Sequence, residues 1–258
     1  MTRAPDAQPR AEVSAAMQRA AAFVESAGDE VAIGRARALV GTQPASVVVE
    51  LLRDLGSEPS VGRLLRMLGI LADLRCTNAA PIERACACLS ASQQSDGSWS
   101  DPESTADDER IFATGMIAGY LAKTPFVRQS TLASAADYLA ARWSPDRVKG
   151  SAWEANLAYF HCFALVRHEQ ADAILQWCGR ELERGFLTGV YDAVQTARVF
   201  ALCKAHALPG SRLAVAELVA RILDEQMDDG GYVSPSGSSR CARVSHTLDA
   251  LAALEHLA

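Results

Sequence analysis

Apolar residues recur at helical spacing along most of the chain. In one segment, Leu64, Leu68 and Leu71 are three or four positions apart, which places their side chains on one face of a helix. Alternating apolar and polar residues, the mark of a half-buried strand, never continue beyond three or four positions. The pattern predicts an all-α fold.

The helical segments group into six consecutive hairpins. Gly41 suits a helix end, and Ser60 suits the cap of a later helix. The expected pairs are residues 11–26 with 30–40, 45–55 with 61–74, 81–94 with 108–122, 128–143 with 152–167, 171–184 with 191–206, and 211–227 with 243–256. Residues 1–10 are expected to form a flexible tail, and residues 11–258 a single domain built as a ring or solenoid of hairpins.

A turn with a fixed residue pattern precedes two of these helices. Near the C-terminus, Gln226 is followed by an Asp-Asp-Gly-Gly run and by Tyr232. Earlier in the chain, Gln94, Asp96 and Trp99 stand in a similar order around a glycine. An Asp-Gly turn suits a tight helix exit, while Gln and Trp offer a hydrogen bond and ring stacking. We therefore expect a structural role for the residues of these turns.

A fainter copy spans residues 181–202, where Gly185 and the phenylalanine after it replace the glycine–aromatic pair. Thr114, Thr196 and Thr247 fall at like positions in the three copies. Repeats of this length mean stacked supersecondary units, none of which buries its apolar face alone. The repeat is clearest in residues 80–258, and it favours one domain over two.

Composition narrows the function classes. The chain has 258 residues, 49% of them apolar, and a net charge of −6, so a nucleic-acid partner, which normally needs a basic face, is not expected. No run approaches about 18 consecutive apolar residues, and the first residues are polar and charged, so neither a membrane span nor a cleavable signal is expected. Seven cysteines, most of them within helical patterns, indicate free thiols in a reducing, cytoplasmic compartment.

The turns at 94–99 and 226–232 resemble the Gln–Trp repeats of squalene–hopene cyclase and related class II terpene cyclases. They are also similar to the turns in the β subunits of protein prenyltransferases. The resemblance implies an α/α toroid, with six inner and six outer helices, in which each turn staples neighbouring units together. It also implies that chemistry takes place at the N-terminal ends of the inner helices.

The chain departs from both families at one position. Class II terpene cyclases carry a DxDDTA-like motif, and its nearest match begins at Asp192 but has Val194 and Gln195 in place of the two following acids. Prenyltransferases hold zinc with an Asp, a Cys two residues later and a His followed by Thr. Asp192 and His246-Thr247 fit that pattern, while Val194 stands where the Cys is needed. The resemblance thus implies the scaffold without either usual reaction.

Three residues are the catalytic candidates. Asp192 is expected to be the principal acid or base, with His246 and Glu154 assisting, because all three fall near the starts of expected inner helices. His246 has the alternative of a hydrogen-bonding role in the ring wall. Glu154 has the alternative of a first-turn charge that offsets the helix dipole.

Arginines at two helix starts suggest an anion pocket. Arg110, Asp192 and Arg243 each lie four residues before a repeat threonine, which predicts a common height at the mouth of the ring. Helix N-termini and guanidinium groups together favour phosphate, sulfate or carboxylate. The alternative is that Arg110 pairs with Asp108 or Glu109, and Arg243 with another carboxylate.

Four further residues complete the expected substrate-binding set. Trp153 and Tyr191 are expected to shape an apolar cavity, with core packing as the alternative. Asp108 belongs to an acidic run whose alternative is helix capping. Gln195 stands where the DxDDTA-like motif of class II terpene cyclases has its last acid, and it is expected to contact the substrate.

Arg243 has one specific alternative partner on its own helix, Asp249, on a solvated rim. A zinc site built from Asp192, His246 and either Cys203 or Cys241 is a further alternative, although no CxxC or HExxH spacing supports it. We therefore expect neither a cofactor nor a metal ion.

The leading hypothesis is an enzyme of specialised metabolism that folds an anionic small molecule into the ring. It would promote cyclisation or elimination by acid–base positioning, without a redox cofactor. The protein would act alone or as a homo- or hetero-oligomer. One alternative is a non-catalytic toroid that binds a partner protein or a hydrophobic ligand. A weaker alternative is a prenyltransferase β-like subunit that holds zinc.

Overall fold

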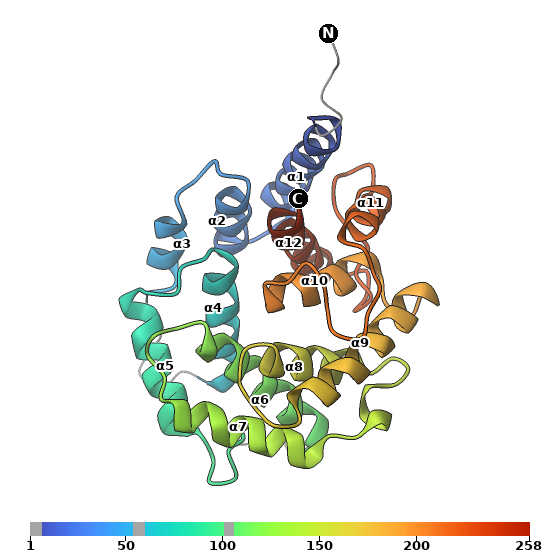
Figure 1. Cartoon of the computed structure of the whole chain (residues 1–258). Helices are drawn as coiled ribbons and strands as arrows, with labels where there is room; N and C mark the ends of the chain where they lie inside the picture. The colour runs from blue at the N-terminus through green and yellow to red at the C-terminus, as the bar shows by residue number, and fades with distance from the viewer. Residues whose placement is uncertain (1–6, 54–59, 101–105) are drawn as a thin grey trace. The chain divides into compact units, whose positions relative to one another are not determined.

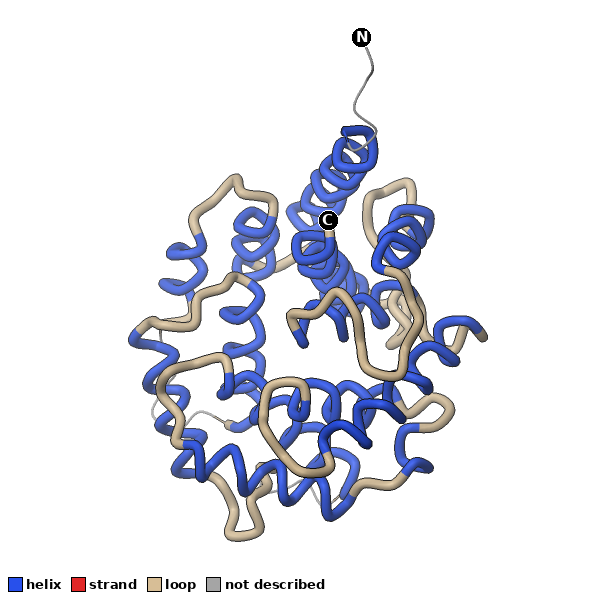
Figure 2. Tube along the Cα trace, viewed as in Figure 1, coloured by secondary structure: helices blue, strands red, loops and turns tan. Residues whose placement is uncertain are grey.

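The structure is a computed structural model that describes residues 7–53, 60–100 and 106–258. Within these ranges the chain forms twelve α-helices and one short 3-10 helix, and no strand (Figures 1 and 2). The all-α prediction is confirmed, and each of the twelve expected helices is present near its expected place.

The helix bounds are as follows. The α-helices are α1 (Ala7–Ala27), α2 (Glu30–Leu39), α3 (Ala45–Leu51), α4 (Val61–Asp73), α5 (Ala80–Ser92), α6 (Asp107–Ala122), α7 (Gln129–Arg142), α8 (Trp153–Phe163), α9 (Ala171–Leu187), α10 (Ala193–Cys203), α11 (Val215–Glu225) and α12 (Arg240–Leu257), and the 3-10 helix η1 is Pro145–Val148. Residues 1–6 of the expected tail lie outside the described residues, and α1 begins four residues earlier than expected.

Local capping chemistry explains where several helices begin. The Asp29 carboxylate accepts the Ala32 N–H at 2.8 Å and starts α2. Ser60 starts α4 in the predicted way, because its hydroxyl accepts the Arg63 N–H. Gly185, expected in a turn, instead lies inside α9, and the connection from α9 to α10 is shorter than those in the two clear copies of the repeat.

The contacts divide the chain into two compact units. Unit 1 comprises residues 1–51, 192–207 and 213–258, and unit 2 comprises residues 52–191 and 208–212. In unit 2, α6 packs against α4, α7 and α8, and α8 packs against α9. In unit 1, α12 packs against α1, α2 and α10, so the first and last helices of the chain are in contact (Figure 1).

Some helices are buried on nearly every side. Residues 114–121 of α6 and 156–163 of α8 are consecutively buried, and so are residues 250–254 of α12. By contrast α4 and α11 bury one apolar stripe each. A helix that is buried all round lies in the interior, whereas a striped one covers a surface. Thus α6, α8 and α12 lie in the interior of their units, as does α10, in which residues 196–200 are consecutively buried.

The first Gln–Asp–Gly turn staples its hairpin to the next helix. Gln93 Nε2 donates to Gly97 O within the turn, at 2.9 Å, and to Thr131 O of α7, at 3.0 Å. Trp99 is fully buried, and its indole N–H donates to Leu89 O at 2.7 Å. The amide therefore joins two hairpins through backbone groups, while the indole closes the turn on its own helix.

The second turn repeats these contacts at the end of the chain. Gln226 Nε2 donates to Gly230 O and to Ala16 O of α1, each at 2.9 Å. The second turn thus docks on α1 in the same way as the first turn docks on α7. The equivalent of Gln226 is Gln93 and not Gln94, which corrects the pairing expected from the sequence. Gln94 instead donates to the Ser100 hydroxyl.

The repeat threonines hold the residue that follows each turn. Thr114 Oγ1 accepts the Trp99 N–H at 3.0 Å, and Thr247 Oγ1 accepts the Tyr232 N–H at 3.2 Å. Each bond ties a buried aromatic residue to the helix that comes after it. Thr196 has no such loop to hold, and its hydroxyl donates to Asp192 O one turn back, at 2.9 Å.

The close approach of the second turn to α1 predicts a large penalty for a side chain there. Gly230 has φ +86°, and a Cβ atom would lie 2.4 Å from Arg19 O. Gly41 has a similar φ of +75°, with nothing within 4 Å. We expect Gly41→Ala to cost about 1 kcal/mol of unfolding free energy, and Gly230→Ala about 2–4 kcal/mol because overpacking adds to the backbone strain.

Urea denaturation of the two variants measures this difference. Equal losses in Gly230→Ala and Gly41→Ala would show that the turn does not press against α1.

Candidate functional site

Asp192 caps α10 and fixes its own carboxylate in doing so. Its Oδ1 accepts the Gln195 N–H at 2.7 Å, and Gln195 Oε1 accepts the Asp192 N–H at 3.2 Å. This reciprocal pair is a capping box, in which an N-cap side chain and the third helical residue satisfy each other's free backbone donors. Gln195, a predicted substrate-binding residue, is therefore used in capping.

The structure brings the predicted pair Asp192 and His246 together. His246 Nε2 of α12 lies 3.1 Å from Asp192 Oδ2, the oxygen that is not used in the cap. The His246 side chain is 8% exposed and that of Asp192 27%. The distance suits a hydrogen bond, but the ring N–H is not aligned with the oxygen, so the contact is a close pair and not a completed hydrogen bond.

The second imidazole nitrogen of His246 is placed differently. Nδ1 makes no hydrogen bond to the part of the chain that the structure describes, and it is not among the fully enclosed atoms. One nitrogen of the ring thus lies against a carboxylate, and the other has no hydrogen-bond partner among the described residues.

A second polar cluster, which the sequence reasoning missed, lies one turn further along α12. Asp249 Oδ1 is 3.4 Å from Arg198 Nε of α10 and 3.8 Å from Arg35 Nη2 of α2. Both arginines are only 9% exposed. Their positions within otherwise apolar helix faces, and the three-residue spacing of Asp249 from His246, are the signals that could have found them. The cluster ties α2, α10 and α12 together.

Arg110 is held by the turn that precedes its helix. Its Nη2 donates to Asp96 Oδ2 at 2.8 Å, to Ser98 Oγ at 2.7 Å and to Gln94 Oε1 at 3.0 Å. Burial raises the pKa of Asp96, but hydrogen bonds from Ser98 and the Arg110 charge outweigh it, so the pKa lies below its usual value. The expected alternative partners, Asp108 and Glu109, are replaced by Asp96.

Arg243 repeats this arrangement in unit 1. Its Nη2 donates to both carboxylate oxygens of Asp229, each at 2.9 Å, and its guanidinium lies over the Phe23 ring. The expected alternative partner, Asp249, pairs with other arginines. Arg243 lines a pocket of about 320 Å³ together with Arg240, which donates to Ser26 O. Arg110 and Arg243 are thus each paired with a carboxylate of their own turn.

The remaining candidates lie in unit 2. Glu154 is exposed, with no hydrogen bond or ion pair to the described residues. The Trp153 and Tyr191 rings are in contact, with centroids 5.4 Å apart, and Tyr191 donates its hydroxyl to Gly150 O at 2.9 Å. Burial raises the pKa of Tyr191. These aromatic contacts fit the packing alternative for Trp153 and Tyr191.

Asp108 carries an ion pair at the start of α6. Its Oδ1 accepts Arg147 Nη1 at 2.8 Å, and its side chain is 83% exposed. Asp107 lies 3.5 Å from the same guanidinium. The acidic run therefore binds η1 to the first turn of α6, where negative charge also suits the helix dipole.

The metal-binding alternative concerns residues that are all described. Among the described parts of the chain, no three His, Cys, Asp or Glu side chains gather in a way that could hold a metal ion. Of the two candidate thiols, Cys203 is buried and Cys241 exposed, and neither is in a disulfide.

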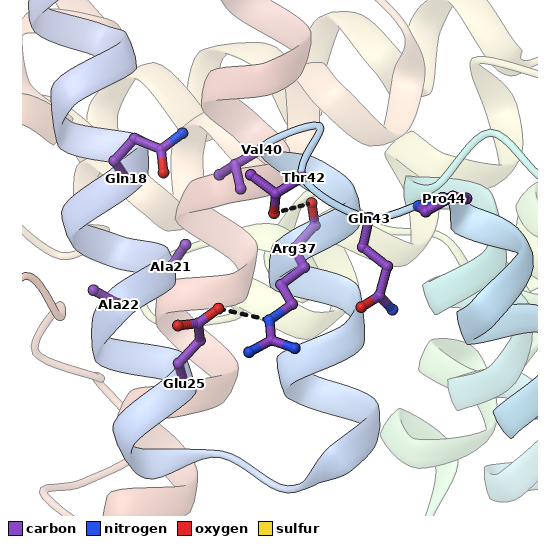
Figure 3. A pocket seen from close by; sticks show the side chains of 9 residues that line it. All are labelled: Gln18, Ala21, Ala22, Glu25, Arg37, Val40, Thr42, Gln43 and Pro44. Atoms are coloured by element: carbon purple, nitrogen blue, oxygen red, sulfur yellow. Dashed lines mark hydrogen bonds and ion pairs between the residues drawn. The ribbon is translucent and has the colours of Figure 1, made fainter.

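A surface groove of about 410 Å³ lies between α1 and the α2–α3 connection (Figure 3). Its two charged side chains pair with each other, because Arg37 Nε donates to Glu25 Oε1 at 2.7 Å. The Thr42 hydroxyl donates to Arg37 O at 3.1 Å. None of the predicted site residues lines this groove.

Compared with protein-family profiles and with curated protein sequences, the chain matches none. The resemblance to terpene cyclases and prenyltransferases stays a prediction. No helix in the described residues is both long enough and apolar enough to span a membrane.

The ion pair between Arg243 and Asp229 at the second turn predicts that the stability of the fold depends on pH. The hydrogen bond from Arg243, with one from the Gly231 N–H, holds the pKa of Asp229 below its usual value. Such a carboxyl stabilises the fold above its unfolded pKa of about 3.9, and this stabilisation is lost as the pH falls through the lower folded pKa. The Asp229 side chain is half exposed, so we expect less than about 1 kcal/mol.

A carbon-13 NMR titration of the Asp229 carboxyl checks this contact. Arg243→Gln should move the Asp229 pKa upward, and an unchanged titration curve would contradict the pairing.

Proposed function

We propose that this protein is an acid–base enzyme that acts on a small molecule, with Asp192 and His246 as its catalytic dyad. The observation that carries the proposal is the 3.1 Å approach of His246 Nε2 to Asp192 Oδ2. Two residues far apart in the sequence meet there, at the N-terminus of a buried helix. Cyclisation or elimination, the reaction class implied by the resemblance, needs a proton-transfer group of this kind.

The roles of the two residues follow from their contacts. Asp192 is restrained by the capping box, so its Oδ2 presents a fixed negative charge to the ring. That charge orients the imidazole and stabilises it when it takes up a proton, as the carboxylate does in other carboxylate–histidine pairs. His246 is then the proton-transfer group through Nδ1, and Asp192 is the positioning residue.

The toroid belongs to the same proposal. Within each unit the even-numbered helices pack in order, α4 with α6 and α6 with α8, then α10 with α12. The last even-numbered helix, α12, also packs against the first one, α2. The turn before α12 also docks on α1 as the turn before α6 docks on α7. These contacts support a ring of hairpins that closes at the termini.

The substrate's anionic group is not assigned to Arg110 or Arg243. Both guanidinium groups are matched by a carboxylate of their own turn, and binding a second anion would mean breaking that pair. The substrate is therefore a small molecule that neither arginine anchors.

Asp192→Asn and His246→Gln test the dyad. Asn is as good an N-cap as Asp, so the first variant should keep α10 while removing the negative charge. Turnover should fall by at least about 100-fold in either variant, which is the usual size of a lost acid–base group. The measurement is consumption of small molecules from a metabolite extract of the producing cells, followed by mass spectrometry.

Asp29→Asn is the matched control, because Asp29 caps α2 with the same type of hydrogen bond and contacts no histidine in the described structure. It should leave turnover unchanged. If the wild-type protein consumes no metabolite, or if all three variants consume it equally, the dyad is not catalytic.

A non-catalytic binding protein is the second candidate. It is favoured by one observation, namely that the expected anion-binding arginines are used inside their own turns. In that case Asp192 and His246 would only join α10 to α12. Asp192→Asn would then lower the unfolding free energy without any turnover to lose.

A further inference from the structure

A groove of about 590 Å³ runs along the outer face of α9 in unit 2. Three arginines line it, namely Arg180 and Arg184 of α9 and Arg212 of the segment that crosses this helix. Glu183 lines it as well. Positive side chains therefore outnumber negative ones here, on a chain whose net charge is −6.

Two glycines place the crossing segment. A Cβ atom on Gly179 would lie 1.9 Å from Pro209 O, and one on Gly210 would lie 2.2 Å from Gln176 O. Only glycine allows backbones to approach so closely. The Arg212 N–H also donates to Glu183 Oε2 at 2.8 Å. The segment is thus pressed onto α9, which sets Arg212 beside the arginines of the helix.

The three guanidinium groups differ in their partners. Arg184 pairs with the buried Glu181, to which its Nε donates at 3.0 Å. Arg180 lies over the Trp177 ring, 4.8 Å from its centroid. Among the described residues, neither Arg180 nor the Arg212 side chain has a carboxylate partner. This contrasts with Arg110 and Arg243, whose charges are matched.

We propose that this groove binds a small polyanion, a molecule that carries two or more phosphate or carboxylate groups. Guanidinium groups recognise both through paired, charge-assisted hydrogen bonds. Two unmatched guanidiniums on one groove provide a place for two anionic groups, whereas the charge of Arg184 is already matched by Glu181. The volume falls in the range of about 300–1,000 Å³ that small-molecule sites occupy. The site is independent of the proposed dyad.

Isothermal titration calorimetry with two probes tests the proposal, with inorganic pyrophosphate as the phosphate source and citrate as the carboxylate source. We expect saturable binding of at least one probe at low ionic strength, weakened by added salt. Arg180→Gln and Arg212→Gln should each weaken that binding about tenfold, since each removes charge-assisted hydrogen bonds. The relative affinities of the two probes identify the preferred anion.

Arg167→Gln is the matched control. Arg167 is exposed and in the same unit, but it does not line the groove, so this variant should bind as the wild type does. Circular dichroism verifies that the substituted proteins are folded. If the wild type shows no saturable binding, or if the Arg167 variant loses as much affinity as the others, the site does not exist. Binding of a polyglutamate peptide alone, with neither small anion, would also overturn the proposal.

Discussion

A hydrogen-bonded turn joins each of two hairpins to a further helix. A glutamine amide bonds a carbonyl of that helix, a glycine lets the backbones meet, and an arginine closes the turn on an aspartate. Each bond alone contributes only about 1 kcal/mol. Together they fix where α6 and α12 begin, because the repeat threonine of each helix holds the turn's last residue.

That register decides which residues of α12 face α10. His246 directly precedes the repeat threonine Thr247, so the hydrogen bond that holds Thr247 also sets the backbone position of His246. On the facing helix the capping box holds Asp192 in a similar way. The close pair between these two side chains therefore results from two local constraints that act at separate places in the sequence. Asp249, Arg198 and Arg35 join the same helices one turn further along.

Sequence patterns predicted the helices well and the contacts of polar side chains less well. Periodic apolar residues require a buried face wherever they occur, so α4 and α11 are evident without any tertiary information. The sequence also places Asp192 and His246 near the starts of two inner helices, and the structure brings these two side chains within 3.1 Å of each other. Partners of charged residues depend on angles between helices, which periodicity does not contain.

The arginines illustrate this limit. The sequence predicts an anion-binding role for Arg110, with acids on its own helix as the alternative partners, but the side chain reaches back across the turn to Asp96. The buried pair of Arg198 and Asp249 was missed because neither residue belongs to a motif. The sequence predicts Gln94 as the glutamine of the first turn, but the structure uses Gln93. Two adjacent glutamines are equivalent in sequence and differ only in the direction of their side chains.

Nitrogen-15 NMR of the His246 ring tests whether the Asp192 carboxylate orients this imidazole. At a pH where the ring is neutral, we expect the proton on Nε2, facing Asp192 Oδ2. In Asp192→Asn the cap keeps the amide oxygen, and the NH₂ group then faces Nε2, so the proton should move to Nδ1. If both proteins show the same tautomer, Asp192 does not orient the imidazole.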